Sequence, residues 1–312
     1  MSKETLAFVF PGQGSQKIGM LADLAAEYPQ VQACFAEASE VLGYDLWDMV
    51  QNGEQEDINQ TERTQPLLLT ASVALWRIWS EKGGAVPSVL AGHSLGEWSA
   101  LVAAEVLAFT DAVKLVQLRG KFMQEAVPAG VGAMAAIIGL DDEQIKSACD
   151  SASSAGVVSA VNFNSPGQVV IAGEAAAVEL AINACKEAGA KRALPLPVSA
   201  PFHTSLMKPA AEQLSAFIAE TEFKTPTIPV IHNVNAQGES DPAAIKDLMI
   251  EQIYSPVLWV DCVKAMAAGG VETTVECGPG KVLSGLSKRI DRALKGMATE
   301  SPADLDKALE NV

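Results

Sequence analysis

A serine between two glycines is the residue of this sequence best placed to do chemistry. It lies in the run Gly-His-Ser-Leu-Gly at 92–96, after a short apolar run at 86–91 and before a helix-forming run at 97–104. Glycines suit this place because a strand that turns directly into a helix packs its backbone too tightly for side chains. The pattern predicts that Ser94 presents its hydroxyl at the end of a sheet as a nucleophile. The alternative is a serine that only caps the helix after a glycine turn.

Attack on a carbonyl also needs hydrogen-bond donors for the oxyanion that forms. The first N–H groups of a helix have no partner within the helix, so the N–H of Leu95 can serve. A second glycine loop, Pro-Gly-Gln-Gly-Ser-Gln at 11–16, follows a strand expected at 5–10, and the N–H of Gln13 is its natural donor. This loop is not a nucleotide-binding fingerprint, because Lys17 stands at the place of the third glycine and no Gly-Lys-Ser/Thr follows.

A general base for the serine must come from one of three histidines. His203 lies at the boundary between the loop 199–204 and a helix, facing the cleft expected between two domains. His93 is the runner-up, but as the immediate neighbour of the serine it should point away from the hydroxyl. His232 ends an apolar, strand-like run and is expected in the core or at the end of a strand. We therefore predict that His203 is the base.

Arg119 occupies a position where a charge is unusual. A helix capped by Thr110 and Asp111 should run to about Glu125, and at about 100° per residue Arg119 falls near the centre of its apolar face. Leaving a buried charge unpaired is costly, so this arginine needs an anion. Two interpretations stay open: a structural salt bridge with an acidic residue, or a substrate carboxylate held by the guanidinium fork. The apolar face consists of Ala112, Leu115, Val116, Phe122 and Met123.

The remaining pattern alternates strands with helices, as in a mostly parallel sheet with helices on both faces. A ligand then belongs at the carboxyl ends of the strands, where the serine lies. The stretch 132–194 reads strand, helix, strand, strand, helix, strand, which is the signature of a ferredoxin-like insert. We expect a large domain formed by 1–126 and 199–312, and an inserted small domain formed by 127–198.

The other elements follow from periodicity and from turn residues. Helices are expected at 20–41, with a break near Pro29, and at 70–82. A strand is expected at 271–276, and one final helix is expected after it.

The bulk composition narrows the class of protein. The chain has 312 residues, of which 49% are hydrophobic, and no apolar run approaches the roughly 20 residues that cross a bilayer. The apolar run at 6–10 is too short for a secretory signal, so we expect a cytoplasmic protein. Its five cysteines are scattered without a C-x-x-C pair or a histidine at zinc-finger spacing, which predicts reduced thiols and no metal site.

The charge balance is strongly acidic. A formal net charge of -16 argues against nucleic-acid binding, which needs a basic surface. One basic cluster near the C-terminus departs from this sign, and we favour a solvated helix face over a docking patch for an acidic partner. The cluster consists of Lys281, Lys288, Arg289, Arg292 and Lys295.

Several motifs, taken together and in order, resemble the malonyl-CoA:acyl carrier protein transacylases of bacterial fatty-acid synthesis. The resemblance spans essentially the whole chain. Together with the order of elements, it implies an α/β fold with an α/β-hydrolase-like, mostly parallel sheet core and an inserted ferredoxin-like small subdomain. The motifs are those at 11–16, 92–97, 117–120, 162–168 and 200–203.

The resemblance implies a role for each candidate site residue. Ser94 is the nucleophile that becomes acylated, and His203 is its base. Arg119 holds the malonyl carboxylate, while the N–H groups of Gln13 and Leu95 form the oxyanion hole.

Three further site residues follow from the same resemblance. A backbone carbonyl, at the glutamine that matches Gln252, orients the histidine in place of an acid. In that family, a phenylalanine before the histidine, here Phe202, is associated with selection of malonyl over methylmalonyl as the acyl group. We also assign His93 to the substrate-binding residues. The chain departs from the usual pattern at Trp98, Thr204 and Leu258.

The implied reaction is a transfer in two steps. Malonyl passes from malonyl-CoA to the serine, and then to the phosphopantetheine thiol of acyl carrier protein. We expect no bound cofactor, no contact with membranes and a monomer that meets its carrier protein transiently. Two alternatives remain: a serine esterase or thioesterase on the same turn, and a non-catalytic subunit that only binds acyl groups.

Overall fold

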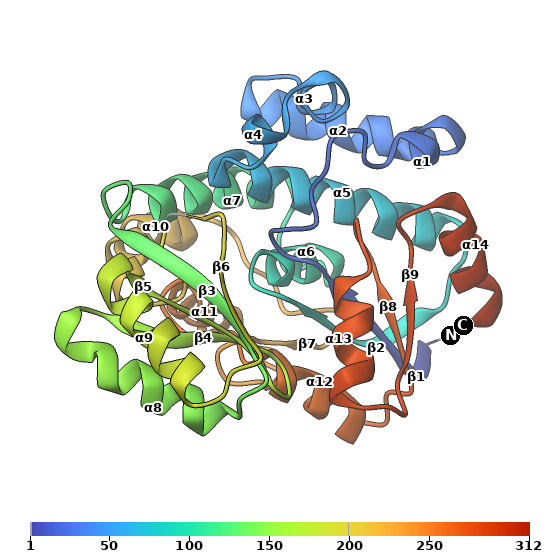
Figure 1. Ribbon diagram of the computed structural model, residues 1–312. Helices are drawn as coiled ribbons and strands as arrows, with labels where there is room; N and C mark the ends of the chain where they lie inside the picture. Colours follow the sequence, from blue (N-terminus) through green and yellow to red (C-terminus); the bar gives the residue numbers. More distant parts are fainter. Residues whose placement is uncertain (1, 199) are drawn as a thin grey trace.

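The computed structural model describes residues 2–198 and 200–312. Met1 and Ser199 lie outside this part, so the predicted return loop 199–204 is described from Ala200 onward. Two sheets stand side by side (Figure 1). The predicted α/β class, with a parallel core sheet and a smaller antiparallel sheet, is confirmed.

The larger sheet is parallel throughout its five strands. Because every neighbour is parallel, the carboxyl ends of the strands meet at one edge, where the serine turn lies. Its strands, in spatial order, are β7 (Val230–Ile231), β2 (Val86–Gly92), β1 (Ser2–Phe10), β8 (Thr273–Glu276) and β9 (Lys295–Ala298).

Helices cover both faces of this sheet. Along β1, Leu6, Phe8 and Phe10 face one apolar cluster, whereas Ala7 and Val9 face another. Both sets are fully buried, which explains why the strand is apolar without alternation. The first cluster includes residues of α2 (Pro29–Leu42), α5 (Thr61–Glu81), α6 (Leu95–Ala103) and α7 (Phe109–Glu125), and the second includes residues of α12 (Trp259–Ala268) and α13 (Val282–Ile290).

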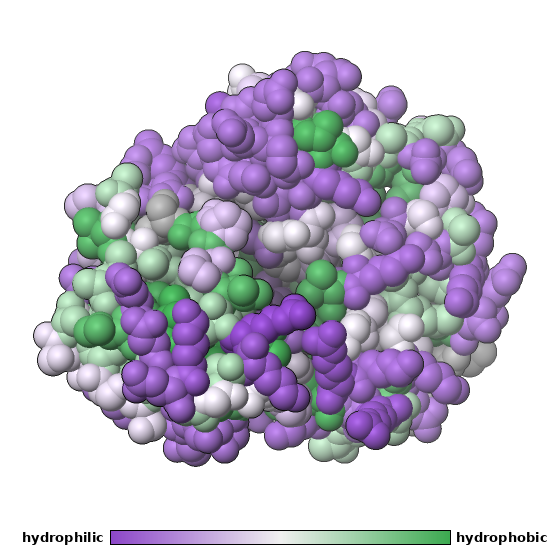
Figure 2. Space-filling view, in the orientation of Figure 1, coloured by the Kyte–Doolittle hydropathy of each residue, from purple (hydrophilic) through white to green (hydrophobic). Residues whose placement is uncertain are grey.

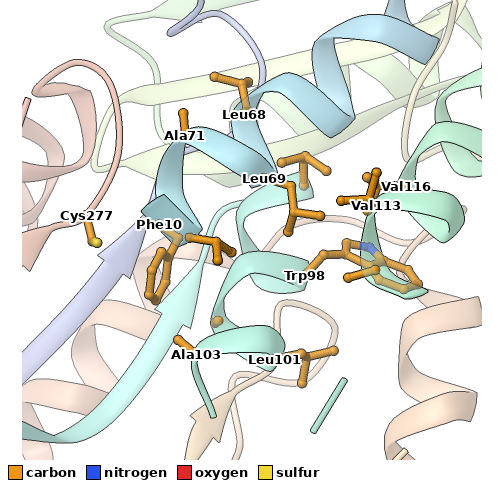
Figure 3. Packing of buried hydrophobic residues seen from close by; sticks show 14 of the residues in the cluster. Phe10, Leu68, Leu69, Ala71, Trp98, Leu101, Ala103, Val113, Val116 and Cys277 are labelled. Atoms are coloured by element: carbon orange, nitrogen blue, oxygen red, sulfur yellow. The ribbon is translucent and has the colours of Figure 1, made fainter. Parts of the chain in front are cut away.

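The helix that carries the serine is itself packed inside the core. Trp98 of α6 lies against Val113 and Val116 of α7 and near Leu69 of α5 (Figure 3). All four side chains are buried. Close packing on several sides fixes the direction in which α6 leaves β2.

The small sheet is antiparallel and has the spatial order β4 (Val158–Ser165), β5 (Gln168–Glu174), β3 (Gly132–Ile138) and β6 (Arg192–Pro195). The helices α8 (Asp142–Ala152) and α9 (Ala175–Glu187) complete the predicted strand-helix-strand-strand-helix-strand order. Asp141 caps α8 in a capping box with Gln144, as its sequence indicates. The division into domains at 126/127 and 198/199 stays a prediction.

The two faces of the small sheet pack differently. Val169 and Ile171 of β5 join a cluster with α8 and α9, whereas Val170 and Ala172 join the core of the larger part. Strand β4 is also tied to the larger part through Val257, whose N–H donates to the carbonyl of Val161 at 2.7 Å. The small sheet is therefore docked on the larger part by side chains and by backbone.

Three predictions about single elements are wrong. Helix α5 begins at Thr61 rather than near 70, because the polar residues Thr64 and Gln65 find partners inside the fold. Helix α7 begins at Phe109 after Ala108, so Thr110 and Asp111 lie within its first turn and do not cap it. In place of the single final helix that was predicted, the chain forms α13, then β9, and then α14 (Pro302–Asn311).

The remaining helices are short or peripheral. The helical run predicted at 20–41 is interrupted before Pro29, as expected. The elements are α1 (Ala22–Glu27), α3 (Leu46–Asn52), α4 (Gln55–Ile58), α10 (Lys208–Glu220) and α11 (Pro242–Glu251), with single turns of 3-10 helix at Ser153–Ala155 and Ser205–Met207.

Candidate active site

Ser94 stands on the turn between β2 and α6 in a strained backbone conformation. Its φ of 51° and ψ of -110° lie outside the regions that L-residues prefer. The flanking glycines are obligatory here: a Cβ on Gly92 would lie 2.0 Å from Gly96, and one on Gly96 would lie 2.0 Å from the carbonyl oxygen of Phe10. The turn is thus the strand-turn-helix predicted from the sequence.

The imidazole of His203 lies within hydrogen-bond distance of the Ser94 hydroxyl. Its Nε2 lies 2.8 Å from Ser94 Oγ, and its Nδ1 lies 2.9 Å from the backbone carbonyl oxygen of Gln252. A carbonyl only accepts hydrogen bonds, so Nδ1 carries the proton and Nε2 presents its lone pair to the hydroxyl. The serine and histidine, which are 109 residues apart in the chain, are therefore paired in the tautomer that a general base requires.

Burial keeps this histidine neutral. His203 is 3% exposed. Burial, followed by the nearby guanidinium of Arg119, lowers the pKa of His203 from 6.5 to about 3. The base form is consequently the resting form at neutral pH.

The lowered pKa of His203 predicts the pH dependence of the free enzyme. We expect kcat/KM for the acylating substrate to stay level from pH 8 down to about pH 5, because His203 loses its base form only as pH falls toward about 3. The unfolded chain takes up this proton near 6.5, so the histidine's contribution to stability is lost as pH falls from 6.5 toward 3. A kcat/KM profile with an inflection near 6.5 in folded protein would contradict this assignment.

Arg119 lies behind the serine with its guanidinium held by neutral oxygens. Nη1 donates to Gln65 Oε1 at 2.8 Å, and Nη2 donates to Gln252 Oε1 at 3.0 Å and to Ser94 Oγ at 3.3 Å. The side chain is 1% exposed, and none of the ion pairs in residues 2–198 and 200–312 involves it. Arg119 therefore has no carboxylate partner among the described residues, which argues against the first interpretation, a structural salt bridge.

Arg119 stays charged although its side chain is buried. Desolvation lowers the pKa of Arg119 to about 10, against an opposing effect of Glu97. The guanidinium therefore stays protonated at neutral pH and places a cation beside Ser94. Its Nε atom is buried without a partner in the described part of the chain, which leaves a donor for an anion.

The backbone around the serine leaves one N–H group unused. Ser94 N–H donates to Asn233 Oδ1 at 2.7 Å, Gly96 N–H to the carbonyl of His93, and Glu97 N–H to that of Ser94. Leu95 N–H has no such acceptor within the described residues. It is the donor predicted for the oxyanion.

A cavity of about 440 Å³ opens onto the serine between the two sheets. Gln13, His93, Phe202 and His203 line it with Ser94, whereas Arg119, Leu95 and Gln252 do not belong to its lining. Met123, Met134 and Leu196 give the cavity apolar walls. Figure 2 shows a hollow near the centre of this face of the molecule.

His93 is engaged away from the serine. Its Nε2 lies 2.7 Å from Asn164 Oδ1 on β4, and its ring packs 5.6 Å from that of Trp259. Burial lowers the pKa of His93. This histidine joins the turn to the small sheet at the wall of the cavity, and His232, as predicted, is fully buried.

Three residues of this site were not predicted from the sequence. Gln65 holds Arg119 through its amide oxygen, while Glu97 and Asn233 bond to groups beside the serine. All three are buried polar side chains, and such residues need partners. The available signal was the polar pair Thr64-Gln65 within a helix and a glutamate three residues after the nucleophile.

Residues 2–198 and 200–312 hold neither a metal-binding cluster nor a membrane-spanning helix. No three histidine, cysteine, aspartate or glutamate side chains there are grouped to hold a metal ion. Nor does any helix in that part combine the length and apolar character needed to span a membrane. All five cysteines are free and buried.

Comparison with known proteins places this chain among the acyl transferases. The family described as "acyl transferase domain" matches residues 7–302. The malonyl CoA-acyl carrier protein transacylase of Salmonella typhimurium is 60% identical over 303 residues, covering 97% of this chain and 98% of that protein. The protein of the same name from Bacillus subtilis is 48% identical and covers 100% of this chain and 98% of its own.

Solved structures agree with the sequence relatives. An acyl carrier protein S-malonyltransferase from Vibrio cholerae superposes with a TM-score of 0.95 at 63% identity, covering 97% of this chain and 99% of that one. A malonyl-transacylase solved in complex with a type II polyketide acyl carrier protein superposes with a TM-score of 0.97 at 57% identity, covering 98% and 99%.

Proposed function

This chain belongs to the acyl transferase family and, within it, to the malonyl CoA-acyl carrier protein transacylases, and on that premise we propose that it moves malonyl from malonyl-CoA to the phosphopantetheine thiol of acyl carrier protein through an ester on Ser94. One observation carries the assignment of residues. The oxygen Ser94 Oγ lies 2.8 Å from the base His203 and 3.3 Å from the cation Arg119. Nucleophile, base and anion-binding group thus meet at one atom.

In the first step the serine attacks the thioester. His203 Nε2 takes the hydroxyl proton as Ser94 Oγ bonds to the thioester carbonyl carbon, and the carbonyl oxygen becomes an oxyanion held by Leu95 and Gln13 N–H groups. The carbon–sulfur bond then breaks, and the imidazolium returns its proton to the leaving coenzyme A sulfur. The products are coenzyme A and a malonyl ester on the serine.

The second step reverses the first with a different thiol. His203 takes the proton of the phosphopantetheine thiol, whose sulfur attacks the ester carbonyl. The carbon–oxygen bond to Ser94 breaks, and the proton passes from the imidazolium to the serine. Each step uses only side chains, backbone N–H groups and two thiols, so we propose no bound cofactor.

Arg119 selects the acyl group. The free carboxylate of malonyl pairs with the guanidinium beside Ser94, which anchors the far end of a three-carbon acyl group while its thioester carbon meets Oγ. Phe202, 8% exposed at the cavity wall, restricts the space beside that carbon. His93, on the turn between β2 and α6, also lines this cavity.

The contact of His203 with a carbonyl argues against the esterase alternative. A serine hydrolase orients its histidine with a carboxylate, which also stabilises the imidazolium. Here Nδ1 meets the uncharged carbonyl of Gln252, and the imidazolium additionally faces Arg119. We propose that the weaker base favours attack by a thiol over attack by water.

Intact mass spectrometry separates the proposed function from its two alternatives. After incubation with malonyl-CoA, the enzyme should gain the mass of one malonyl group, which then leaves upon addition of carrier protein bearing phosphopantetheine. Loss of the group in buffer alone would indicate a hydrolase. No mass gain at all would indicate a non-catalytic acyl-binding subunit.

We propose that acyl carrier protein docks, through acidic residues of its own, on the basic surface of α13 and the segment after it. Lys288 and Arg289 are exposed there with Arg292 and Lys295. Lys281 is better excluded from the docking set, because it is paired with Glu300 and Asp304. Figure 2 shows hydrophilic side chains gathered beside the central hollow, on the side of α13.

Charge reversal tests this docking surface. Lys288→Glu with Arg289→Glu should raise the KM for carrier protein about 10-fold at low salt, with a smaller effect at high salt. Acylation by malonyl-CoA alone should be unchanged. Lys264→Glu, an exposed lysine on α12, is the control, and an unaltered KM for carrier in the double variant would count against the proposal.

Three further assignments complete the account. We propose that 127–198 is an inserted subdomain, as its own antiparallel sheet and apolar cluster support. We also propose that the enzyme is a cytoplasmic monomer, consistent with a complete set of site residues in one chain. Sedimentation of the purified protein tests the oligomeric state.

A further inference from the structure

A buried carboxylate that the mechanism does not use lies beside the nucleophile turn. Glu97 is in the first turn of α6 and is 1% exposed. Its oxygens accept three hydrogen bonds: from His232 Nδ1 at 2.7 Å, from Asn233 N–H at 3.1 Å and from Gln252 Nε2 at 2.7 Å. In the described part of the chain it forms no ion pair with a lysine or arginine, so hydrogen-bond donors alone hold this acceptor.

These bonds decide which end of the Gln252 amide faces the arginine. The Nε2 group donates both to Glu97 Oε2 and to the backbone carbonyl of Ser94, at 2.7 and 3.0 Å. The amide oxygen is thereby left to accept from Arg119 Nη2 at 3.0 Å. A reversed amide would set an NH₂ group against the guanidinium, donor against donor.

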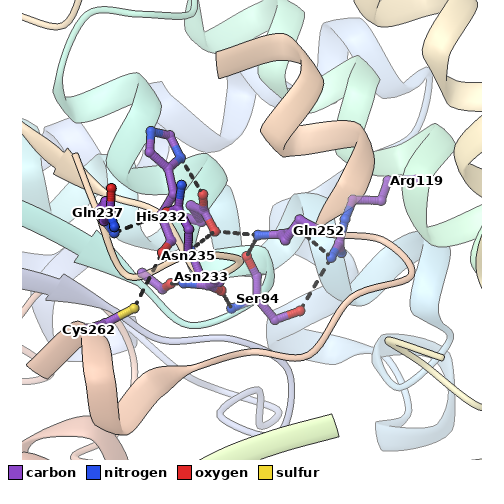
Figure 4. Close-up of polar contacts among 10 residues, drawn as sticks. Ser94, Arg119, His232, Asn233, Asn235, Gln237, Gln252 and Cys262 are labelled. Carbon is purple, nitrogen blue, oxygen red and sulfur yellow. Dashed lines mark hydrogen bonds and ion pairs between the residues drawn. The ribbon is translucent and has the colours of Figure 1, made fainter. Parts of the chain in front are cut away.

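Asn233 links the same carboxylate to the strained backbone. Its side chain accepts the N–H of Ser94 and donates to the carbonyl of Gly92, both at 2.7 Å, and so grips the turn on both sides. Its own N–H is held by Glu97. Figure 4 shows Asn233, Gln252 and Arg119 arranged around Ser94.

We propose that Glu97 is a positioning residue that sets the selectivity of the enzyme for malonyl. It orients Gln252, and through Gln252 the guanidinium of Arg119, and it holds Asn233 against the serine turn. His232 donates a hydrogen bond from Nδ1 to the Glu97 carboxylate. The inference rests on the proposed function, since it presupposes that the arginine binds the malonyl carboxylate.

The test replaces the carboxylate by an amide of the same shape. Glu97→Gln turns one acceptor into a donor, which must either oppose an N–H donor or force His232 into its other tautomer. We expect the rate of malonylation of Ser94 by malonyl-CoA to fall about 10- to 100-fold, as small misplacements of reacting groups do. Acetylation by acetyl-CoA, which offers no carboxylate, should fall less, so the malonyl-to-acetyl ratio should drop.

A double-mutant cycle shows whether Glu97 acts through the arginine. With Arg119→Ala already in place, adding Glu97→Gln should leave the malonyl-to-acetyl ratio where the single arginine variant put it. A merely structural role would not produce this non-additivity. If the ratio drops further by the full single-mutant factor, the action through Arg119 is wrong.

Matched variants guard against a general loss of stability. Glu276→Gln removes another fully buried carboxylate, one that accepts the N–H groups of Leu283 and Ser284 at the start of α13, and its ratio should stay at the wild-type value. If Glu97→Gln does not fold, Glu97→Asp carries the test, because it keeps the charge but withdraws it from Gln252 by one carbon–carbon bond. There too the ratio should fall.

The outcomes are distinct. Equal losses for malonyl and acetyl, or an unchanged ratio in folded Glu97 variants, would overturn the positioning role while leaving the proposed function intact. Failure of the wild-type enzyme to form any malonyl-serine would instead overturn the proposed function itself.

Discussion

Ser94→Ala should abolish the malonyl-enzyme and with it the transfer of malonyl to carrier protein. Alanine keeps the Cβ atom and therefore the steric demands of the turn, whose φ is 51°. The change removes only Oγ, together with its contacts to His203 and Arg119. Gln65 and Gln252 still hold the guanidinium. We therefore expect a folded protein without covalent chemistry.

Intact mass after incubation with malonyl-CoA measures this directly. The control is Ser99→Ala, which removes a buried hydroxyl of the same helix that has no hydrogen-bond partner within the described chain. That variant should be acylated like the wild type. A malonyl mass gain in Ser94→Ala would point to another nucleophile.

Arg119→Ala should lower malonyl transfer about 100-fold or more, since a charged, forked hydrogen bond contributes roughly 1.5 to 3 kcal/mol per contact. Uncharged acyl groups should suffer far less, because they do not need the cation. The readout is the ratio of kcat/KM values for malonyl-CoA and acetyl-CoA. Lysine at this position keeps a charge without the fork and should restore only part of the ratio.

Stability must be measured beside this ratio. Alanine leaves Gln65 Oε1 and Gln252 Oε1 without their donor and opens a cavity in the core, so a lower melting temperature is expected. Arg77→Ala is the control for loss of an arginine, because Arg77 is half-exposed and pairs with Glu37 away from the cavity. If folded Arg119→Ala transferred malonyl as fast as the wild type, the assignment of Arg119 to the malonyl carboxylate would be wrong.

Local patterns in the sequence were sufficient for the parts of the site whose constraints are local. The glycines around Ser94 mark a close backbone approach that the distances to Gly96 and Phe10 explain. Helical periodicity placed Arg119 on a buried face, where it is 1% exposed. The predicted order of strands and helices in 132–194 also matches the small sheet.

The parts that escaped prediction depend on contacts between distant segments. Glu97 and Gln252 bond to each other across 155 positions, and Arg119 and Gln65 across 54. No periodicity reports such pairs. The predicted cap of α7 was wrong for a related reason. Phe109 is buried, at 6% exposure, so packing starts the helix before the two residues, Thr110 and Asp111, that could have capped it.

Strand β9 was missed because its own residues barely indicate a strand. Its four residues, Lys-Gly-Met-Ala, include a glycine and no β-branched side chain, and it forms only by pairing with β8. The proposed oxyanion donors, similarly, are backbone N–H groups, which every residue but proline has. Only the turn geometry singles out Leu95.

The central claim is that a malonyl ester on Ser94 passes to a thiol of carrier protein rather than to water. The most direct measurement isolates the malonyl-enzyme, divides it, and follows intact mass in buffer alone and with carrier protein bearing phosphopantetheine. We predict that the malonyl group persists in buffer and moves quantitatively onto the carrier. Loss at the same rate in both samples, with no malonyl on the carrier, would contradict the account.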